Sequence, residues 1–197
     1  MLGKDRMAAK STIEPASRML VAPPWDGACP GCGLVLTRRG GPLHVYLGAS
    51  SACWELFQRL AGSSGPQPDP VRVRRLVQDT YAAQHPGTRA RRAVQSVALH
   101  LMDLCVQLER DGEVRRLVPV LGRMPARKSL ELHWLDPPAI RGTMTVVDAL
   151  RAGDGEERAV LVEAWARQVW AAWEPHHDTV RGWLDAVPIA DTTVRAS

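Results

Sequence analysis

The sequence predicts an all-α fold, a single domain of about six helices with a small, irregular, cysteine-rich metal-binding lobe at its N-terminal side. After residue 50, apolar side chains recur at helical spacing in nearly every segment. Residues 30–50 lack this periodicity, and three of the four cysteines lie in or beside them. We therefore expect a flexible arm over 1–24, one helical domain over 25–188 that includes the cysteine-rich lobe 25–54, and a disordered tail over 189–197.

Capping and helix-breaking residues bound the first two helices. Ser50 and Ser51 are good caps for a helix that starts after them and ends at about Ala61. A loop rich in glycine, serine and proline follows, and Pro70 then suits the first turn of a helix over 70–85. This second helix ends at Pro86, because a residue before proline is disfavoured in the helical conformation.

The clearest helical pattern covers 89–110. One apolar stripe runs along it, formed by Val94, Val97, Ala98, Leu101, Leu104, Cys105 and Leu108. A shorter helix is expected over 113–123, where Pro119 would kink it. The proline-rich segment 125–142 is expected to be irregular.

Three more helices are expected towards the C-terminus. Thr145 and Asp148 have the spacing of a capping box and begin a short helix. A long helix covers 156–173, and Pro175 begins the last one. A weaker pattern predicts a short helix over 13–20 within the N-terminal arm.

The bulk composition is that of an ordinary globular protein, with 45% hydrophobic and 23% charged residues. The net charge of +4 comes mainly from arginines spread along the chain, which is a weak argument for a nucleic-acid partner. No apolar run approaches the length of a membrane span, and the charged N-terminus lacks the apolar run of a signal peptide. We therefore expect a cytoplasmic protein without a membrane partner.

The motif Cys29-Pro30-Gly31-Cys32-Gly33 is the strongest signal of chemistry in the chain. A Cys-x-x-Cys pair can grip one face of a tetrahedral ion, and in a reducing compartment it indicates a metal site, usually for zinc, before a disulfide. A redox-active pair is the alternative, which the glycine-rich continuation disfavours. Val35-Leu36 and Val45-Tyr46-Leu47 could pair as a small hairpin after the motif.

Two completions of this metal site remain open. His44 and Cys53 would give a set of three cysteines and one histidine, with Cys53 in the first turn of its helix, where the helix dipole favours a thiolate. His85 and His100 could take their place and would tie the lobe to the helical core. Cys105 lies within an apolar stripe and is interpreted as a core residue.

A line of polar residues runs beside the apolar stripe of the 89–110 helix, formed by Arg92, Ser96, His100, Asp103 and Gln107. Their spacing puts them on one face, which indicates either a solvated surface or one wall of a polar pocket.

Catalytic candidates come from this face and from the helix before it. His85 and His100 could serve as ligand or general base, with Tyr81 beside them. The residues that would line the pocket are Gln84, Ser96, Asp103 and His176. His85, His100 and His176 could also converge as the three protein ligands of a catalytic metal.

Six segments give the sequence a resemblance to a known family. They are CPGCGL from Cys29, GPLHVY from Gly41, ASSACW from Ala49, YAAQHPG from Tyr81, QSVALHL from Gln95 and WAAWEPHH from Trp170. Over residues 27–184 the chain resembles an uncharacterised bacterial family, largely actinobacterial, catalogued as a domain of unknown function. The resemblance implies a small cytoplasmic bacterial protein and draws attention to these cysteines and histidines, but it implies no activity.

The sequence supports two functions. The first, slightly favoured, is a zinc-dependent bacterial enzyme whose metal polarises a small molecule or peptide or activates water. The second is a non-catalytic binding module with a structural zinc. It would contact nucleic acid or a protein through arginines near one helix–helix turn, namely Arg72, Arg74, Arg75, Arg89, Arg91 and Arg92. Four protein ligands would favour the second function, and an open coordination position would favour the first.

Overall fold

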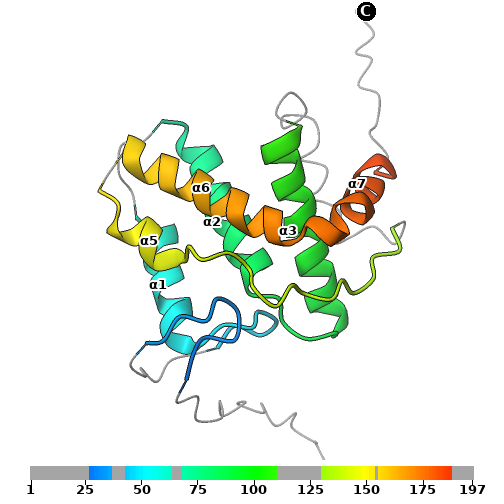
Figure 1. Cartoon of the computed structure of the whole chain (residues 1–197), viewed down its shortest axis with the longest axis horizontal. Helices are drawn as coiled ribbons and strands as arrows, with labels where there is room; N and C mark the ends of the chain where they lie inside the picture. Colours follow the sequence, from blue (N-terminus) through cyan, green and yellow to red (C-terminus); the bar gives the residue numbers. More distant parts are fainter. Residues whose placement is uncertain (1–26, 37–42, 64–67, 111–129, 154, 188–197) are drawn as a thin grey trace, which may run out of the picture.

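The computed structural model describes residues 27–36, 43–63, 68–110, 130–153 and 155–187. These residues form six α-helices and one 3-10 turn, and none of them lies in a β-strand (Figure 1). The predicted all-α class is therefore confirmed. The arm over 1–24, the tail over 189–197 and the helices expected over 13–20 and 113–123 lie outside the described residues.

The first two helices begin at the caps that the sequence indicates. α1 spans Ser51–Ala61, and the Ser50 hydroxyl accepts a hydrogen bond of 3.3 Å from the backbone N–H of Cys53. α2 spans Pro70–Gln84, with its proline in the first turn and the Asp69 carboxylate accepting a first-turn N–H at 3.0 Å. Side-chain caps of this kind satisfy donors that the helix itself leaves free.

The later helices also follow the sequence pattern. α3 spans Arg91–Glu109, and α5 spans Val146–Arg151 behind a capping box of which both hydrogen bonds are present. α6 spans Glu156–Ala172. The last helix begins as a 3-10 turn, η3 over Glu174–His176, and continues as α7 over His177–Asp185. Among the helices that the structure describes, none combines the length and apolar character needed to cross a bilayer.

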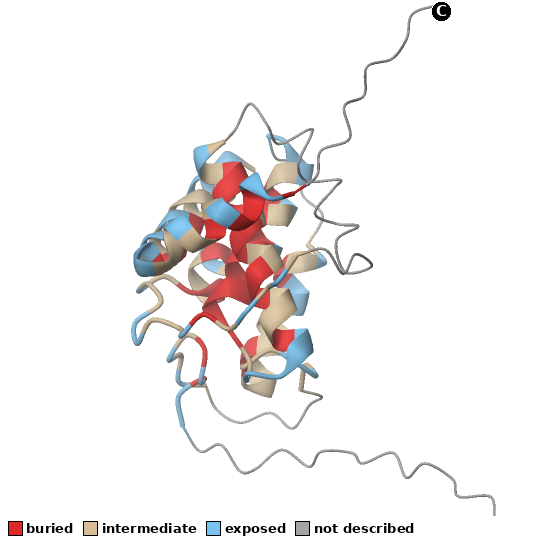
Figure 2. Ribbon diagram, turned by 90° about the vertical axis from the view of Figure 1, so that its right-hand side faces the viewer, coloured by how far each residue is buried: buried red, intermediate tan, exposed pale blue. Residues whose placement is uncertain are grey.

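The helices pack around α2, which contacts both α3 and α6. Figure 1 shows α6 crossing in front of α2, with α1 and α5 together at one end and α7 beside α3. Large side chains fill the space between the helices, and Figure 2 shows this buried core in red. Its fully buried members include Leu76, Tyr81, Leu101, Met102, Leu104, Trp165 and Trp173. Removing this apolar surface from water is the main favourable term in folding.

The small hairpin expected within the cysteine-rich lobe is not formed. Val35 makes an isolated bridge with Ala28, and Leu47 makes one with Pro86, just beyond the end of α2. Val35 and Leu47, which were expected to lie on facing strands of the hairpin, therefore pair with other segments of the chain. The second half of the lobe is docked across the C-terminal end of α2, which brings the cysteines to that end of the helix.

Gln84 is a fully buried polar residue that joins three parts of the core. Its amide nitrogen donates to the carbonyl oxygens of Arg141 and Met144, each at 2.9 Å, and its amide oxygen accepts from the indole N–H of Trp165 at 3.2 Å. The side chain therefore fastens the irregular segment before α5, and also α6, to the last turn of α2. It lies in the core and does not line an open pocket.

We expect Gln84→Leu to lower the free energy of unfolding by about 2–4 kcal/mol, because it leaves two carbonyls and one indole N–H buried without partners. Urea unfolding followed by circular dichroism measures this change. Gln78→Leu, on an exposed position of the same helix, is the matched control and should stay within about 0.5 kcal/mol of the wild type. Equal effects of the two substitutions would contradict the bridging role of Gln84.

Candidate metal centre

Four potential ligand atoms from three segments of the chain meet at the end of α2. They belong to Cys29, Cys32, Cys53 and His85, and all four lie within 4.8 Å of one another. Three sulfur atoms and one imidazole nitrogen are the donor set of a common structural zinc site. A possible metal centre, predicted from the cysteine motif, is thus present in the structure.

The Cys-x-x-Cys pair is presented by a tight turn. The backbone N–H of Cys29 donates to the Leu34 carbonyl at 2.9 Å, and the N–H of Gly33 donates to the Cys29 carbonyl at 2.8 Å. Gly33 has φ +75°, a conformation that glycine adopts without strain. The turn folds the chain back behind Cys32 and directs both thiols to the same place.

Cys53 enters from the first turn of α1, where it is fully buried. Its Sγ lies 3.8 Å from that of Cys32. The backbone N–H of Ser50, at the N-cap of the same helix, donates to the Cys29 sulfur at 3.4 Å. Free N–H groups at a helix N-terminus stabilise negative charge, so α1 favours thiolates at both positions.

His85 closes the group from the C-terminal end of α2. Its Nδ1 lies 2.7 Å from the carbonyl oxygen of Tyr81, which can only accept, so Nδ1 carries the proton. Nε2 is the ring nitrogen left for a metal ion, and it lies 3.4 Å from the Cys53 sulfur. An imidazole held through one nitrogen by a backbone carbonyl, with the other nitrogen free, is the usual arrangement of a metal-ligating histidine.

The electrostatics of the three thiols call for a cation. Hydrogen bonds from Cys32 and Cys53 hold the pKa of the Cys29 thiol far below its usual range. The hydrogen bond with Cys29 in turn raises the pKa of Cys32 to about 11 and also raises the pKa of Cys53. A divalent cation would allow all three to ionise, because it replaces the shared protons as the positive partner.

Arg141 is a residue of this centre that the sequence analysis missed. Its Nη1 donates to the carbonyl oxygens of Pro30, at 3.1 Å, and Gly31, within the Cys-x-x-Cys turn. It also reaches the carbonyl oxygen of Gln84 at 3.5 Å. The guanidinium therefore fastens the turn to the end of α2 and brings a positive charge close to the thiols. It comes from an irregular proline-rich segment that has no periodicity to point to it.

Tyr81 supports His85 and does not face solvent. Its ring stacks on the His85 ring with 4.0 Å between centroids, and its hydroxyl donates to the Cys53 sulfur at 3.6 Å. Burial and the neighbouring Cys53 raise the pKa of the Tyr81 phenol. Because Tyr81 is fully buried, it positions the metal ligands, and a substrate would not reach it.

His44 lies outside the group of four. Its ring stands edge-on to that of Tyr46, with 4.4 Å between centroids, and beside that of Trp54 at 4.6 Å. Burial and the charge of His100 lower the pKa of His44. The structure thus brings together one residue from each predicted completion, Cys53 and His85.

The other candidate residues are dispersed. His100 lies with Asp79 and Asp103 in a second group between α2 and α3. The ring Nε2 of His176 donates to the Asp136 carbonyl at 2.8 Å. The three histidines that could have formed a catalytic triad of ligands therefore do not meet. The Ser96 hydroxyl is buried and has no hydrogen-bond partner among the described residues.

Asp79 is the member of the second group that the sequence analysis missed. It lies three residues after the buried Leu76 on α2 and is itself only 4% exposed. A carboxylate at a helical position in register with a buried apolar stripe is a detectable signal, because such a group is buried only with partners.

Two of the six arginines proposed to contact nucleic acid form ion pairs with acidic side chains. Arg72 lies in the first turns of α2, about 18 Å along that helix from the turn that precedes α3. It is paired with Glu163 at 2.8 Å, and Arg89, near that turn, is paired with Asp136 at 2.6 Å. Both charges are thus already compensated within the described part of the molecule.

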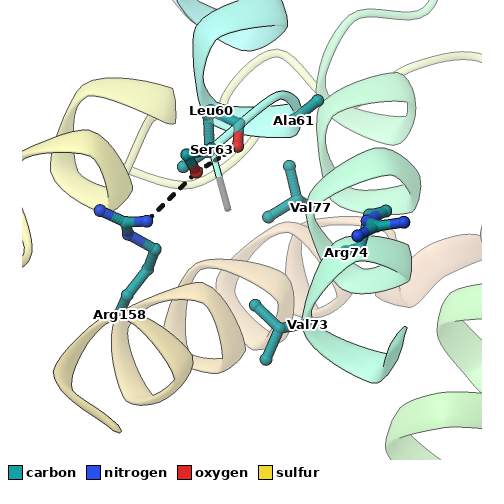
Figure 3. Close-up of a pocket in the computed structure, with 7 residues that line it drawn as sticks. All are labelled: Leu60, Ala61, Ser63, Val73, Arg74, Val77 and Arg158. Carbon is teal, nitrogen blue, oxygen red and sulfur yellow. Dashed lines mark hydrogen bonds between the residues drawn. The ribbon is translucent and has the colours of Figure 1, made fainter. Parts of the chain in front are cut away.

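Figure 3 shows a pocket away from the metal centre, between α1, α2 and α6. Its volume of about 20 Å³ has room for little more than one water molecule. Ser63 and Arg158 are hydrogen-bonded to each other at 3.1 Å at its edge. The pocket is therefore too small to hold a substrate.

Comparison with known proteins places the chain in a family. The family model described as a family of unknown function, DUF5946, matches residues 27–174. The chain belongs to this family. The matched range contains all four residues of the metal centre and most of the described helices. No curated protein and no solved structure matches the chain. The function of this DUF5946 member must therefore be argued from the chemistry of its sites.

We expect Cys53→Ser and His85→Ala each to abolish stoichiometric metal binding, because each removes one of four donor atoms. His44→Ala should keep one metal ion per chain, and Cys105→Ala, which also removes a buried thiol, is the matched control. Metal content after gel filtration, measured by elemental analysis, distinguishes these variants. A loss of metal in His44→Ala with retention in His85→Ala would show that the histidine ligand has been assigned wrongly.

We expect Arg141→Met to weaken zinc binding by about tenfold, because it removes a positive charge and the backbone hydrogen bonds that orient the turn. Competition with a chromophoric chelator measures this affinity. Arg151→Met, at an exposed position of α5, should leave it unchanged. Identical zinc affinities in the two variants would contradict a supporting role for Arg141.

Proposed function

We propose that this chain is a zinc-binding protein of the bacterial cytoplasm, in which one Zn²⁺ bound by Cys29, Cys32, Cys53 and His85 is structural. The observation that carries the proposal is the closed set of four donors, three of which are at most 2% exposed. A zinc ion with four protein ligands has no position left for substrate or water.

Zinc is the ion that the donor set favours. Thiolates and one imidazole suit zinc, and the magnesium, calcium and manganese ions prefer oxygen donors. Three thiolates and one Zn²⁺ leave a net charge of about −1 on the centre. Arg141, which holds the Cys-x-x-Cys turn, supplies a nearby positive charge against it.

The structural role follows from where the ligands come from. Two lie in the part of the N-terminal lobe that precedes α1, one at the start of α1 and one at the end of α2. Only a few residues of the lobe are buried among those described before α1, namely Cys29, Gly31 and Ala49. A lobe with so small an apolar core depends on a metal ion to hold its fold.

These features support the binding module over the zinc enzyme. A zinc-activated water needs an open coordination position and access for a substrate. The ring of His85 and that of Tyr81 are fully buried, so neither can act as a general base on a substrate at this centre. A reaction carried out by this protein would use groups other than the zinc ion.

We expect removal of zinc by a chelator to lower the melting temperature and to expose the lobe first. Thermal unfolding by circular dichroism and hydrogen exchange of residues 27–36 and 43–63 measure the two effects, and added Zn²⁺ should reverse both. The Cys53→Ser variant is the control, because its stability should not respond to the chelator. A melting temperature that stays the same after zinc has demonstrably left would contradict a structural role.

A further inference from the structure

A second polar centre lies between α2 and α3, built from residues that the zinc site does not use. Asp79 comes from α2, and His100 and Asp103 come from adjacent turns of α3. One potential ligand atom of each lies within 4.8 Å of those of the other two. Burying two carboxylates at this separation is costly unless positive charge accompanies them.

Asp79 organises the centre. One of its oxygens lies 2.8 Å from His100 Nδ1, and the other accepts from Gln107 Nε2 at 2.7 Å. The side chain of His100 is 21% exposed, so the centre reaches solvent on one side. A ring nitrogen and two carboxylate oxygens this close together could hold one cation among them.

Two buried oxygen acceptors in this centre have no donor among the described residues. One is a carboxylate oxygen of Asp103, and the other is the amide oxygen of Gln107, a residue only 2% exposed. The amide of Gln107 is fixed against the cluster by its hydrogen bond to Asp79. Buried acceptors normally have partners, so these two atoms indicate a missing positive group. An internal ion pair between His100 and Asp79 explains two of the groups but leaves the oxygens of Asp103 and Gln107 without donors.

We propose that Asp79, His100 and Asp103, with the amide oxygen of Gln107, form a second metal site that takes a divalent cation of the Mn²⁺ or Fe²⁺ class. One imidazole nitrogen and several oxygen donors suit these ions, and the absence of thiolates distinguishes the site from the zinc centre. Because the site reaches solvent beside His100, a bound ion would also carry water ligands, as catalytic metal sites do. The site does not depend on the structural role of zinc.

The test uses the full chain loaded with one equivalent of Zn²⁺ and titrated with Mn²⁺, with free Mn²⁺ followed by electron paramagnetic resonance. The expected result is one Mn²⁺ bound per chain. Asp103→Asn should weaken this binding by at least about tenfold without lowering the melting temperature, because its amide relieves repulsion with Asp79. Glu131→Gln, at an exposed carboxylate, is the matched control and should bind Mn²⁺ like the wild type.

His100→Asn provides a second variant in which Mn²⁺ binding should be lost. The proposal is overturned if zinc-loaded wild type binds no Mn²⁺. It is also overturned if Asp103→Asn and His100→Asn both bind Mn²⁺ as tightly as Glu131→Gln, since the ion would then lie elsewhere. Zinc content measured on the same samples reports separately on the thiolate centre.

Discussion

The imidazole of His85 is the constraint on which the arrangement of this protein depends. Its Nδ1 is held by the Tyr81 carbonyl, which fixes the ring at the end of α2 with Nε2 directed to the thiols. The close fit extends to Gly31, where a Cβ would collide with the His85 ring. The Cys-x-x-Cys turn can approach only because glycine occupies that position.

The same end of α2 also receives the rest of the lobe. Gly48 donates to the His85 carbonyl at 3.0 Å, and a Cβ on Gly87 would collide with the Tyr46 carbonyl oxygen. Arg141 reaches this end from a distant segment and bonds to carbonyls of the turn and of Gln84. Gln84 therefore fastens α6 and the segment before α5 to the end of α2, and His85 lies against the cysteines there.

Most of the fold could be predicted from the sequence because its signals are local. The caps at Ser50 and Thr145, the proline at the start of α2 and the apolar stripe of α3 each act within a few residues of the element they define. The hairpin expected in the lobe was wrong, because Val35 and Leu47 find backbone partners outside the predicted pair. Local patterning cannot reveal such long-range pairing.

The site was predictable only in part for the same reason. The Cys-x-x-Cys spacing indicates a metal by itself, since both ligands lie on one turn. The choice among Cys53, His44, His85 and His100 depends on how α1 and α2 pack, which spacing does not specify. Arg141 carries no pattern at all, because it acts from an irregular segment through backbone carbonyls. Asp79 does have a sequence pattern, because its carboxylate lies in register with buried apolar positions of α2. That pattern indicates the second centre.

The two centres differ in their donor atoms and in their access to solvent. At the end of α2, soft donors close around a buried position, which suits an ion that holds the fold together. Between α2 and α3, nitrogen and oxygen donors surround a position that reaches solvent, and two of its oxygens have no donor among the described residues. A metal site closed by four protein ligands leaves no position for a substrate, whereas a site that keeps water ligands can exchange them for one.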